Sequence, residues 1–216
     1  MMKLYGYWRS SASYRVRIAL AMKEIKVAHI PVNLRTGEQK EADYFARNPQ
    51  GYLPALELED GTILTQSLAI LDYLDAIESE PPLLPGDPVL RAKILAASLG
   101  IAADIHPIQN LSVLKYIRAE HGCDDEAVTT WVRHWIAKGF NALEEIAQTT
   151  DSVFLYTDRP AFFEICLIPQ VYNARRFGID MAAFPRLSAM DEACRILPAF
   201  VKAAPENQSD AVPVHT

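Results

Sequence analysis

The chain has 216 residues, of which 50% are hydrophobic and 22% are charged, and its formal net charge is −6. This composition is typical of a globular protein that buries a core without disulfides. The acidic balance argues against nucleic acid or an anionic membrane as partner, since both select basic surfaces. We expect a cytoplasmic protein, because the chain starts without a signal-peptide pattern and no apolar run approaches a membrane span.

The cysteines and histidines indicate neither disulfides nor a metal site. Cys123, Cys166 and Cys194 are odd in number and widely spaced, which fits a reducing compartment. The five histidines show no metal-ligand spacing, and no phosphate-binding glycine motif is present. We therefore expect no metal.

Residues 1–81 predict a small α/β domain. The chain alternates strand and helix signals in the order β-α-β-α-β-β-α, with the first helix from Ser11 to about Met22 and the last over 67–79. The two strands within 54–65 join at Asp60-Gly61, a strong hairpin signal, so they are antiparallel and the sheet is mixed.

Residues 88–216 predict an all-helical domain. A proline-rich linker over 80–88 precedes it, and strand signals then nearly disappear. A long helical run is broken near Pro107. We expect a loose tail after Pro205, because it is polar. The remaining predicted helices cover 126–148, 162–178 and 186–205.

The stretch WRSSASYRVRIAL places two serines where the first helix begins. Ser10 or Ser11 fits a helix N-cap, and a helix start also stabilises an anion such as a thiolate. No cysteine lies nearby, so such a thiolate has to arrive with a small molecule. The residues leave both interpretations open.

Two further segments have a structural and a functional interpretation. Pro54 either starts a strand or forms a cis bond that turns Leu53 toward an extended ligand. Ser67 fits an N-cap, whereas capping does not explain Gln66 beside it. A second helix start in this small domain therefore offers a site for a carboxylate.

In chain order, the motifs WRSSASYRVRIAL, NPQGYLPALELEDG, TQSLAILDYL, DIHPIQNLSVL and CLIPQVYNARRF resemble the zeta class of glutathione transferases, the maleylacetoacetate and maleylpyruvate isomerases. The resemblance covers nearly the whole chain. It implies a thioredoxin-like first domain, a helical second domain and a homodimer. It also implies that glutathione is the cofactor for cis-trans isomerisation of a maleyl diacid in aromatic-compound catabolism. A general glutathione transferase or dehalogenase is the alternative on the same fold.

The resemblance also implies site residues. Ser10, with Ser11 beside it, is the thiolate-stabilising hydroxyl. Arg9 and Arg176 are candidates for the substrate carboxylates, which suit the planar guanidinium, although each also fits a solvated surface charge. The implied glutathione-binding residues are Gln39, Leu53, Pro54, Gln66, Ser67, His106, Gln109 and Asn110.

The chain departs from the family pattern at several positions. Ala12 replaces the family cysteine, which weakens the choice of maleylacetoacetate over maleylpyruvate. Ala161 and Glu164 replace a capping threonine and an aspartate at the start of a helix. Alanine cannot cap, so we expect another group, with Asp158 as candidate, to satisfy that helix start.

Overall fold

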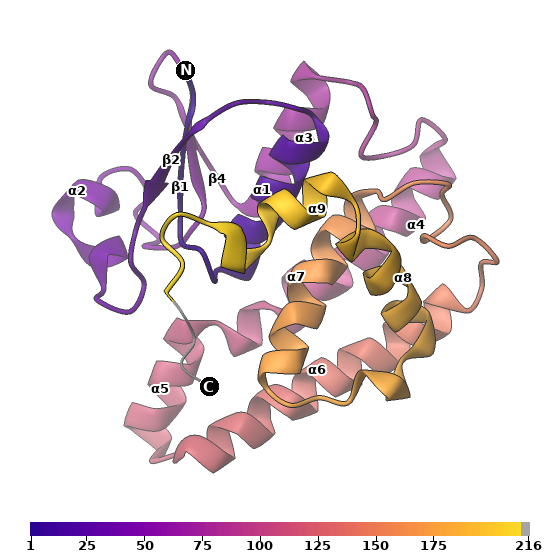
Figure 1. The fold of residues 1–216 in the computed structure, drawn as a ribbon. Helices are drawn as coiled ribbons and strands as arrows, with labels where there is room; N and C mark the ends of the chain where they lie inside the picture. Colours follow the sequence, from indigo (N-terminus) through magenta and orange to yellow (C-terminus); the bar gives the residue numbers. More distant parts are fainter. Residues whose placement is uncertain (213–216) are drawn as a thin grey trace. The chain divides into compact units, whose positions relative to one another are not determined.

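The computed structural model describes residues 1–212, which divide into two compact units (Figure 1). The first unit contains Met1–Leu83 together with the chain from Ile196 onward, and the second contains Leu84–Arg195. No helix within the described residues is long and apolar enough to cross a membrane.

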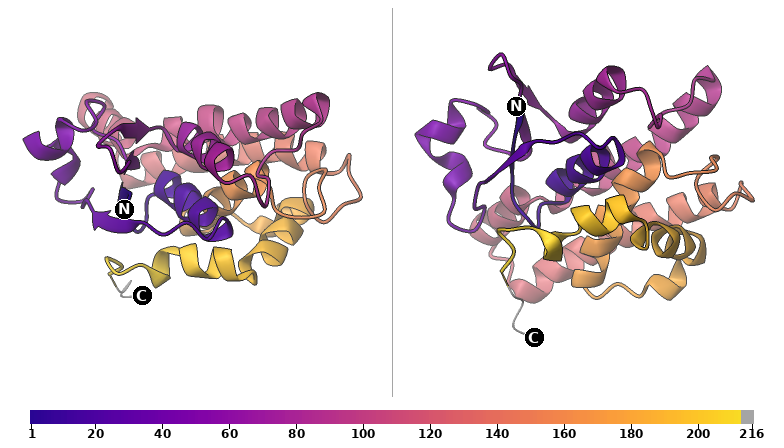
Figure 2. Two further views of the ribbon diagram at one scale, coloured as in Figure 1. Left: turned by 90° about the horizontal axis from the view of Figure 1, so that it is seen from above. Right: turned by 45° about the horizontal axis from the view of Figure 1, so that its top comes forward.

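The first unit is built on a four-stranded sheet with the order β2-β1-β3-β4. β1 is parallel to β2 and antiparallel to β3, and β3 is antiparallel to β4, so the predicted mixed sheet and hairpin are confirmed. The helices α1 and α3 lie on one side of this sheet, and α2 lies on the other (Figures 1 and 2). The elements are β1 (Lys3–Gly6), α1 (Ser11–Met22), β2 (Ala28–Pro31), η1 (Glu38–Lys40), α2 (Ala42–Phe45), β3 (Ala55–Glu57), β4 (Ile63–Thr65) and α3 (Ser67–Ile77).

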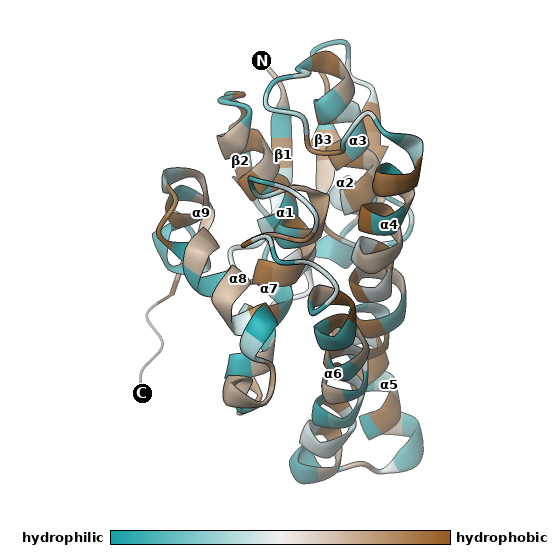
Figure 3. Cartoon of the chain, turned by 90° about the vertical axis from the view of Figure 1, so that its right-hand side faces the viewer, coloured by the Kyte–Doolittle hydropathy of each residue, from teal (hydrophilic) through white to brown (hydrophobic). Residues whose placement is uncertain are grey.

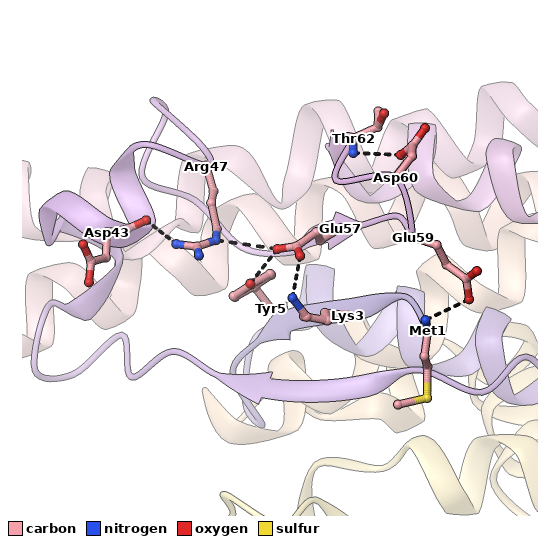
Figure 4. A network of polar contacts seen from close by, with 9 residues as sticks. All are labelled: Met1, Lys3, Tyr5, Asp43, Arg47, Glu57, Glu59, Asp60 and Thr62. Atoms are coloured by element: carbon pink, nitrogen blue, oxygen red, sulfur yellow. Dashed lines mark hydrogen bonds and ion pairs between the residues drawn. The ribbon is translucent and has the colours of Figure 1, made fainter.

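A polar network fixes the register between β1 and β3 (Figure 4). Glu57 lies opposite Lys3 and accepts hydrogen bonds from Lys3 Nζ at 2.6 Å and from the Tyr5 hydroxyl at 2.7 Å. Arg47 Nε lies 3.7 Å from the same carboxylate. A slip of one residue would move Glu57 to the other face of the sheet, so this network opposes the slip.

The second unit is helical, as predicted. The long run breaks earlier than Pro107, because a π-helical turn already begins at Gly100. Residues 162–171 are all buried, which explains the continuous apolar motif there. In Figure 3, hydrophobic and hydrophilic residues alternate along α5 and α6, as expected for helices with one buried face. The elements are α4 (Pro88–Leu99), η2 (Gly100–Ile105), η3 (Pro107–Gln109), α5 (Leu111–His121), α6 (Asp125–Ala147), α7 (Phe162–Arg176), η4 (Met181–Ala183) and α8 (Pro185–Arg195).

The end of the chain differs from the expectation. The helix predicted over 186–205 is two helices, because Pro198 starts a new one, α9 (Pro198–Ala203). α9 packs along α1 in the first unit, and the short turn η5 (Pro205–Asn207) follows it. The tail predicted to be loose is bonded instead, since Asp210 accepts a hydrogen bond from the Trp8 amide at 2.9 Å. Residues 213–216 lie outside the described residues.

Glu164 satisfies the start of α7. Its carboxylate accepts hydrogen bonds from the Ala161 amide at 2.9 Å and from the Leu155 amide at 2.7 Å. Asp158 was the wrong candidate, because it is exposed and pairs with Arg159. Glutamate reaches back where aspartate is too short, so the helix start is tied to the preceding loop without a capping side chain at Ala161.

Burial raises the pKa of Glu164 to about 7. The folded state therefore holds this proton more tightly than the unfolded state, whose pKa is near 4.5. The resulting stabilisation is complete below about pH 4.5 and is lost as the pH rises through about 7, a change of roughly 3 kcal/mol.

We expect Glu164→Gln to remove this pH dependence. The variant is less stable at every pH, because its amide nitrogen replaces one of the two carboxylate oxygens and, as a donor, cannot accept from the N–H group there. Urea denaturation from pH 5 to 8 should show the wild type losing its advantage over the variant as the pH rises. A constant difference across that range would contradict a raised pKa at Glu164.

Candidate active site

Three turns of the first unit meet at one edge of the sheet. The strand directions bring the ends of β1 and β4 and the start of β3 to the same edge. Continuing the register from the pair Tyr5–Ala55 places Tyr7 opposite Leu53, and both residues belong to one buried cluster. Continuing it from Ala55–Thr65 places Leu53 opposite Ser67. Both α1 and α3 therefore begin at this edge.

Ser10 is the N-cap of α1, and Ser11 is the first helical residue. The Ser10 hydroxyl oxygen accepts a hydrogen bond from the Ser13 amide at 3.2 Å. The Ser10 amide donates to the Tyr7 carbonyl at 3.0 Å, which closes the turn after β1. Since the hydroxyl accepts from the helix, its own hydrogen can still be donated to an anion. Capping and anion binding are therefore compatible at Ser10.

The start of α3 carries a backbone outlier. Gln66, not Ser67, occupies the N-cap position, so the predicted cap at Ser67 is wrong by one residue. Gln66 has φ 65° and ψ 117°, a conformation that costs a residue other than glycine on the order of 1 kcal/mol. Such outliers concentrate at ligand sites.

The buried hydroxyl of Ser67 has a cationic partner. It accepts a hydrogen bond from Arg15 Nη1 at 3.2 Å, and both residues are buried. This bond ties α1 to α3 beside the sheet edge. As at Ser10, the oxygen accepts from the protein and the hydroxyl hydrogen remains a donor.

The peptide bond between Leu53 and Pro54 is cis, as one of the two interpretations of that proline requires, and β3 begins directly after it at Ala55. Two donors fix the preceding residue, because the Tyr52 carbonyl accepts from the Tyr44 hydroxyl at 2.6 Å and from Asn48 Nδ2 at 2.8 Å. A ligand contact through the backbone of Leu53 stays a prediction.

Two glutamines lie near the same segment. Gln39 is buried in η1. Its backbone carbonyl oxygen would lie 3.3 Å from a Cβ added at Gly51, so the chain needs glycine there. The exposed Gln66 side chain donates from Nε2 to Gln50 Oε1 at 2.9 Å. Gln66 is thus held above the sheet edge by a surface contact.

In the second unit, Asn173 joins two predicted residues. Asn173 Nδ2 donates to Gln109 Oε1 at 2.7 Å, and Arg176 Nη1 donates to Asn173 Oδ1 at 3.0 Å. Gln109 is 8% exposed, and its Nε2 has no hydrogen-bond partner within residues 1–212. A buried, oriented donor therefore lies beside an exposed guanidinium.

The two neighbouring arginines of this helix, Arg175 and Arg176, have different partners. Arg175 Nη1 lies 2.6 Å from the buried carboxylate of Asp191, so it has a structural partner. Arg176 ends α7, is exposed and lies over the Phe177 ring at 5.8 Å. A substrate role for Arg176 stays a prediction.

The other predicted residues have modest surroundings. His106 is half-buried and precedes η3. Asn110 caps α5, because its Oδ1 accepts from the Ser112 amide at 3.0 Å. Arg9 lies over the Trp8 ring at 5.1 Å. Ligand roles for these three residues stay predictions.

Sequence reasoning missed Asn173 and the contact of Arg15 with Ser67. Asn173 precedes Arg176 by three residues, a helical spacing that indicates a shared face. Gln109 is 64 residues away from Asn173, and Arg15 is 52 residues away from Ser67. No sequence signal pairs residues at such distances.

The chain is similar to known proteins over nearly its whole length. Residues 1–76 match the family model of the glutathione S-transferase N-terminal domain. A probable maleylacetoacetate isomerase of Vibrio cholerae is 47% identical over 210 residues, which are 96% of this chain and 97% of the relative. The chain belongs to the maleylacetoacetate and maleylpyruvate isomerase family, the zeta class of glutathione transferases.

Solved structures of the zeta class agree with this family. The holo structure of a bacterial maleylpyruvate isomerase has a TM-score of 0.95 at 37% identity and covers 97% of this chain and 100% of its own. A maleylacetoacetate isomerase from Anaeromyxobacter dehalogenans, with bound dicarboxyethyl glutathione and citrate, has a TM-score of 0.88 at 39% identity. That match covers 99% of this chain and 98% of the other.

In this zeta-class chain, we expect Gln66→Ala to weaken glutathione binding alone, whereas Ser67→Ala also lowers the free energy of unfolding. Gln66→Ala keeps the free energy of unfolding within about 0.5 kcal/mol, because the side chain is exposed. It weakens glutathione binding about tenfold if the amide holds a carboxylate. Ser67→Ala weakens binding and also costs about 1–3 kcal/mol, since Arg15 loses a buried acceptor. Urea denaturation measures the free energy of unfolding, and calorimetric titration measures glutathione binding. A Ser67→Ala protein as stable as the wild type would refute a stabilising role of the Arg15–Ser67 bond.

Proposed function

We propose that this chain is a glutathione-dependent cis-trans isomerase of a maleyl diacid, of the maleylacetoacetate or maleylpyruvate type. Relatives named for these two activities resemble the chain to a similar degree: a maleylacetoacetate isomerase is 42% identical and a maleylpyruvate isomerase 38%, each over 97% of the chain's length. The observation that carries the proposal is the pair of helix starts, each with a hydroxyl donor, at one edge of the sheet.

The residues at this edge fit glutathione. The tripeptide carries a thiol and two carboxylates. The N-termini of α1 and α3 each favour an anion. We assign the thiolate to Ser10 at the start of α1, with Ser11 beside it. We assign the γ-glutamyl carboxylate to Gln66 and Ser67 at the start of α3. When bound, glutathione supplies the sulfur nucleophile for isomerisation about a carbon–carbon double bond.

The protein's contribution at Ser10 is electrostatic. Its hydroxyl donates to the sulfur, while the free amide groups of the first turn of α1 add partial positive charge. Both effects lower the pKa of a bound thiol, so more of it is ionised at neutral pH. The Ser13 amide holds the hydroxyl oxygen in place and thereby orients its donor hydrogen.

We assign the substrate's carboxylate to Arg176 together with Gln109. The guanidinium offers a bidentate contact, and Gln109 Nε2 is a buried donor that needs an acceptor. A dicarboxylic ligand in the related Anaeromyxobacter enzyme supports this assignment. Arg9 is a second candidate cation, and Gln39, Leu53, Pro54, His106 and Asn110 complete the proposed glutathione and substrate contacts.

The alternative function is conjugation of glutathione to an electrophile, as in a general transferase or dehalogenase. A neutral electrophile would have no use for Arg176 and the oriented Gln109 donor. The two functions differ in stoichiometry, because an isomerase returns glutathione unchanged and a transferase consumes one molecule per turnover.

We expect isomerisation of maleylpyruvate or maleylacetoacetate only when glutathione is present in catalytic amount. Ser10→Ala should lower kcat about 100-fold, the effect of removing one donor to developing charge. Ser11→Ala is the matched control and should stay within a few-fold. An absorbance assay of the diacid measures both, and equal losses in the two variants would contradict the assignment to Ser10.

We expect Arg176→Ala to raise KM for the diacid about 10- to 100-fold, the range for losing a hydrogen bond to a charged group. The Kd of glutathione should remain unchanged. Arg175→Ala serves as the control, because it breaks the ion pair with Asp191 and lowers stability without raising KM. Similar losses for diacid and glutathione would argue against a substrate role.

We further propose a homodimer in the cytoplasm. An apolar groove of about 390 Å3 lies along α4, η2 and α6, with Asp104 and Lys138 of opposite charge on its lining. A twofold contact would pair such charges between copies. Within residues 1–212, which include all three cysteines, no disulfide is formed, in keeping with a reducing compartment. Sedimentation equilibrium tests the dimer, and a monomer at micromolar concentration would exclude it.

A further inference from the structure

The last described segment of the chain is bonded to the turn that carries Ser10. Asp210 Oδ2 accepts a hydrogen bond from the Trp8 amide at 2.9 Å, across 202 residues of sequence. Ala211 packs against the buried cluster that contains Trp8 and Leu53. The end of the chain therefore contacts the turn after β1 through both a charge and an apolar side chain.

Arg17 holds the same turn from inside the unit. Its guanidinium is buried and donates to the Trp8 carbonyl at 2.9 Å and to the Tyr7 carbonyl at 3.3 Å. Its Nε donates to the Ala203 carbonyl at 3.0 Å, where α9 ends. One buried cation thus joins the turn to the segment that leads to Asp210.

The Tyr7 carbonyl and both backbone polar groups of Trp8 are consequently fixed. The Tyr7 carbonyl accepts from both Arg17 and the Ser10 amide, and Trp8 is bonded at its amide and at its carbonyl. A cavity of only about 20 Å3, room for roughly one water molecule, separates this turn from the end of the chain.

We propose that Asp210 is a positioning residue for the active-site serine. By holding the Trp8 amide, it fixes the turn from Tyr7 to Ser10 and so sets the direction in which the Ser10 hydroxyl donates. Arg17 completes the clamp from the opposite side. The inference rests on the proposed role of Ser10, and it assigns a function to a polar tail that contains none of the family's recognisable motifs.

The clamp, formed by Asp210 and Arg17, acts on the direction of the Ser10 hydroxyl more than on the affinity for glutathione. The proposed carboxylate contacts at Gln66 and Ser67 lie on α3, away from the Trp8 bond, so glutathione still binds when the clamp is lost. A misdirected Ser10 hydroxyl stabilises the thiolate less, which raises the pKa of the bound thiol and lowers kcat.

The test compares Asp210→Ala, Asp210→Asn and Glu206→Gln. Asp210→Asn keeps an acceptor for the Trp8 amide without the charge. Glu206→Gln removes the same charge from an exposed residue of the same segment and serves as the matched control. Three quantities are measured: amide hydrogen exchange at Trp8 and Ser10 in glutathione-free protein, the ultraviolet titration of the bound thiol, and kcat with the Kd of glutathione.

For Asp210→Ala, exchange at Trp8 and Ser10 should rise about tenfold, as for loss of one charge-assisted hydrogen bond. The pKa of the bound thiol should rise and kcat should fall about tenfold, with Kd within twofold. Asp210→Asn should lie between Asp210→Ala and the wild type, and Glu206→Gln should match the wild type.

Two results would overturn the inference. If Asp210→Ala lowers only the melting temperature, and the thiol pKa and kcat stay unchanged, the contact is merely structural. If Glu206→Gln shifts the thiol pKa as much as Asp210→Asn does, the effect is one of net charge. A Ser10→Ala protein with an unshifted thiol pKa would refute the proposed role of Ser10 itself, which separates that failure from a failure of the clamp.

Discussion

The first unit depends on two guanidinium groups buried in one helix. Arg15 and Arg17 of α1 are almost fully removed from solvent, and a buried cation is tolerated only when its donors are satisfied. Arg15 donates to Ser67 at the start of α3, and Arg17 donates to three carbonyl oxygens in the turn before α1 and at the end of α9. These bonds therefore hold together the segments that present Ser10 and Ser67.

In the second unit, α7 is the element whose packing fixes the direction of polar side chains. Its buried start is tied to the preceding loop by Glu164, and its last turn carries Asn173 and Arg176. A helix whose first ten residues are all buried has little freedom to rotate, so the polar residues in its last turn have fixed directions. Arg175 reinforces this through the buried Asp191. Rigid packing at one end of the helix thus preorganises a polar group at the other.

Local chemistry made several elements predictable. The Asp60-Gly61 turn, the order of strands and helices in the first 81 residues, and the family motifs all follow from short stretches of sequence. Predictions failed where contacts of the folded chain decide the outcome. Asp158 and Glu164 are both three positions from Ala161, yet it is Glu164 that accepts from the Ala161 amide and also from the Leu155 amide. The polar tail looked loose because nothing near it in sequence indicates Trp8 as a partner.

The sequence by itself determined the family, the secondary structure of the first unit and the residue types at both helix starts, because these depend on contiguous motifs and short-range propensities. Only the tertiary structure decided that Ser10 is the cap and Ser11 the first helical residue, that Arg175 pairs with Asp191 while Arg176 bonds to Asn173, and that the chain end returns to the turn after β1. The Arg175–Asp191 ion pair spans 16 positions of the sequence, and the bond from Trp8 to Asp210 spans 202. Such bonds form only after the core has packed, and they therefore leave no periodic trace in the sequence.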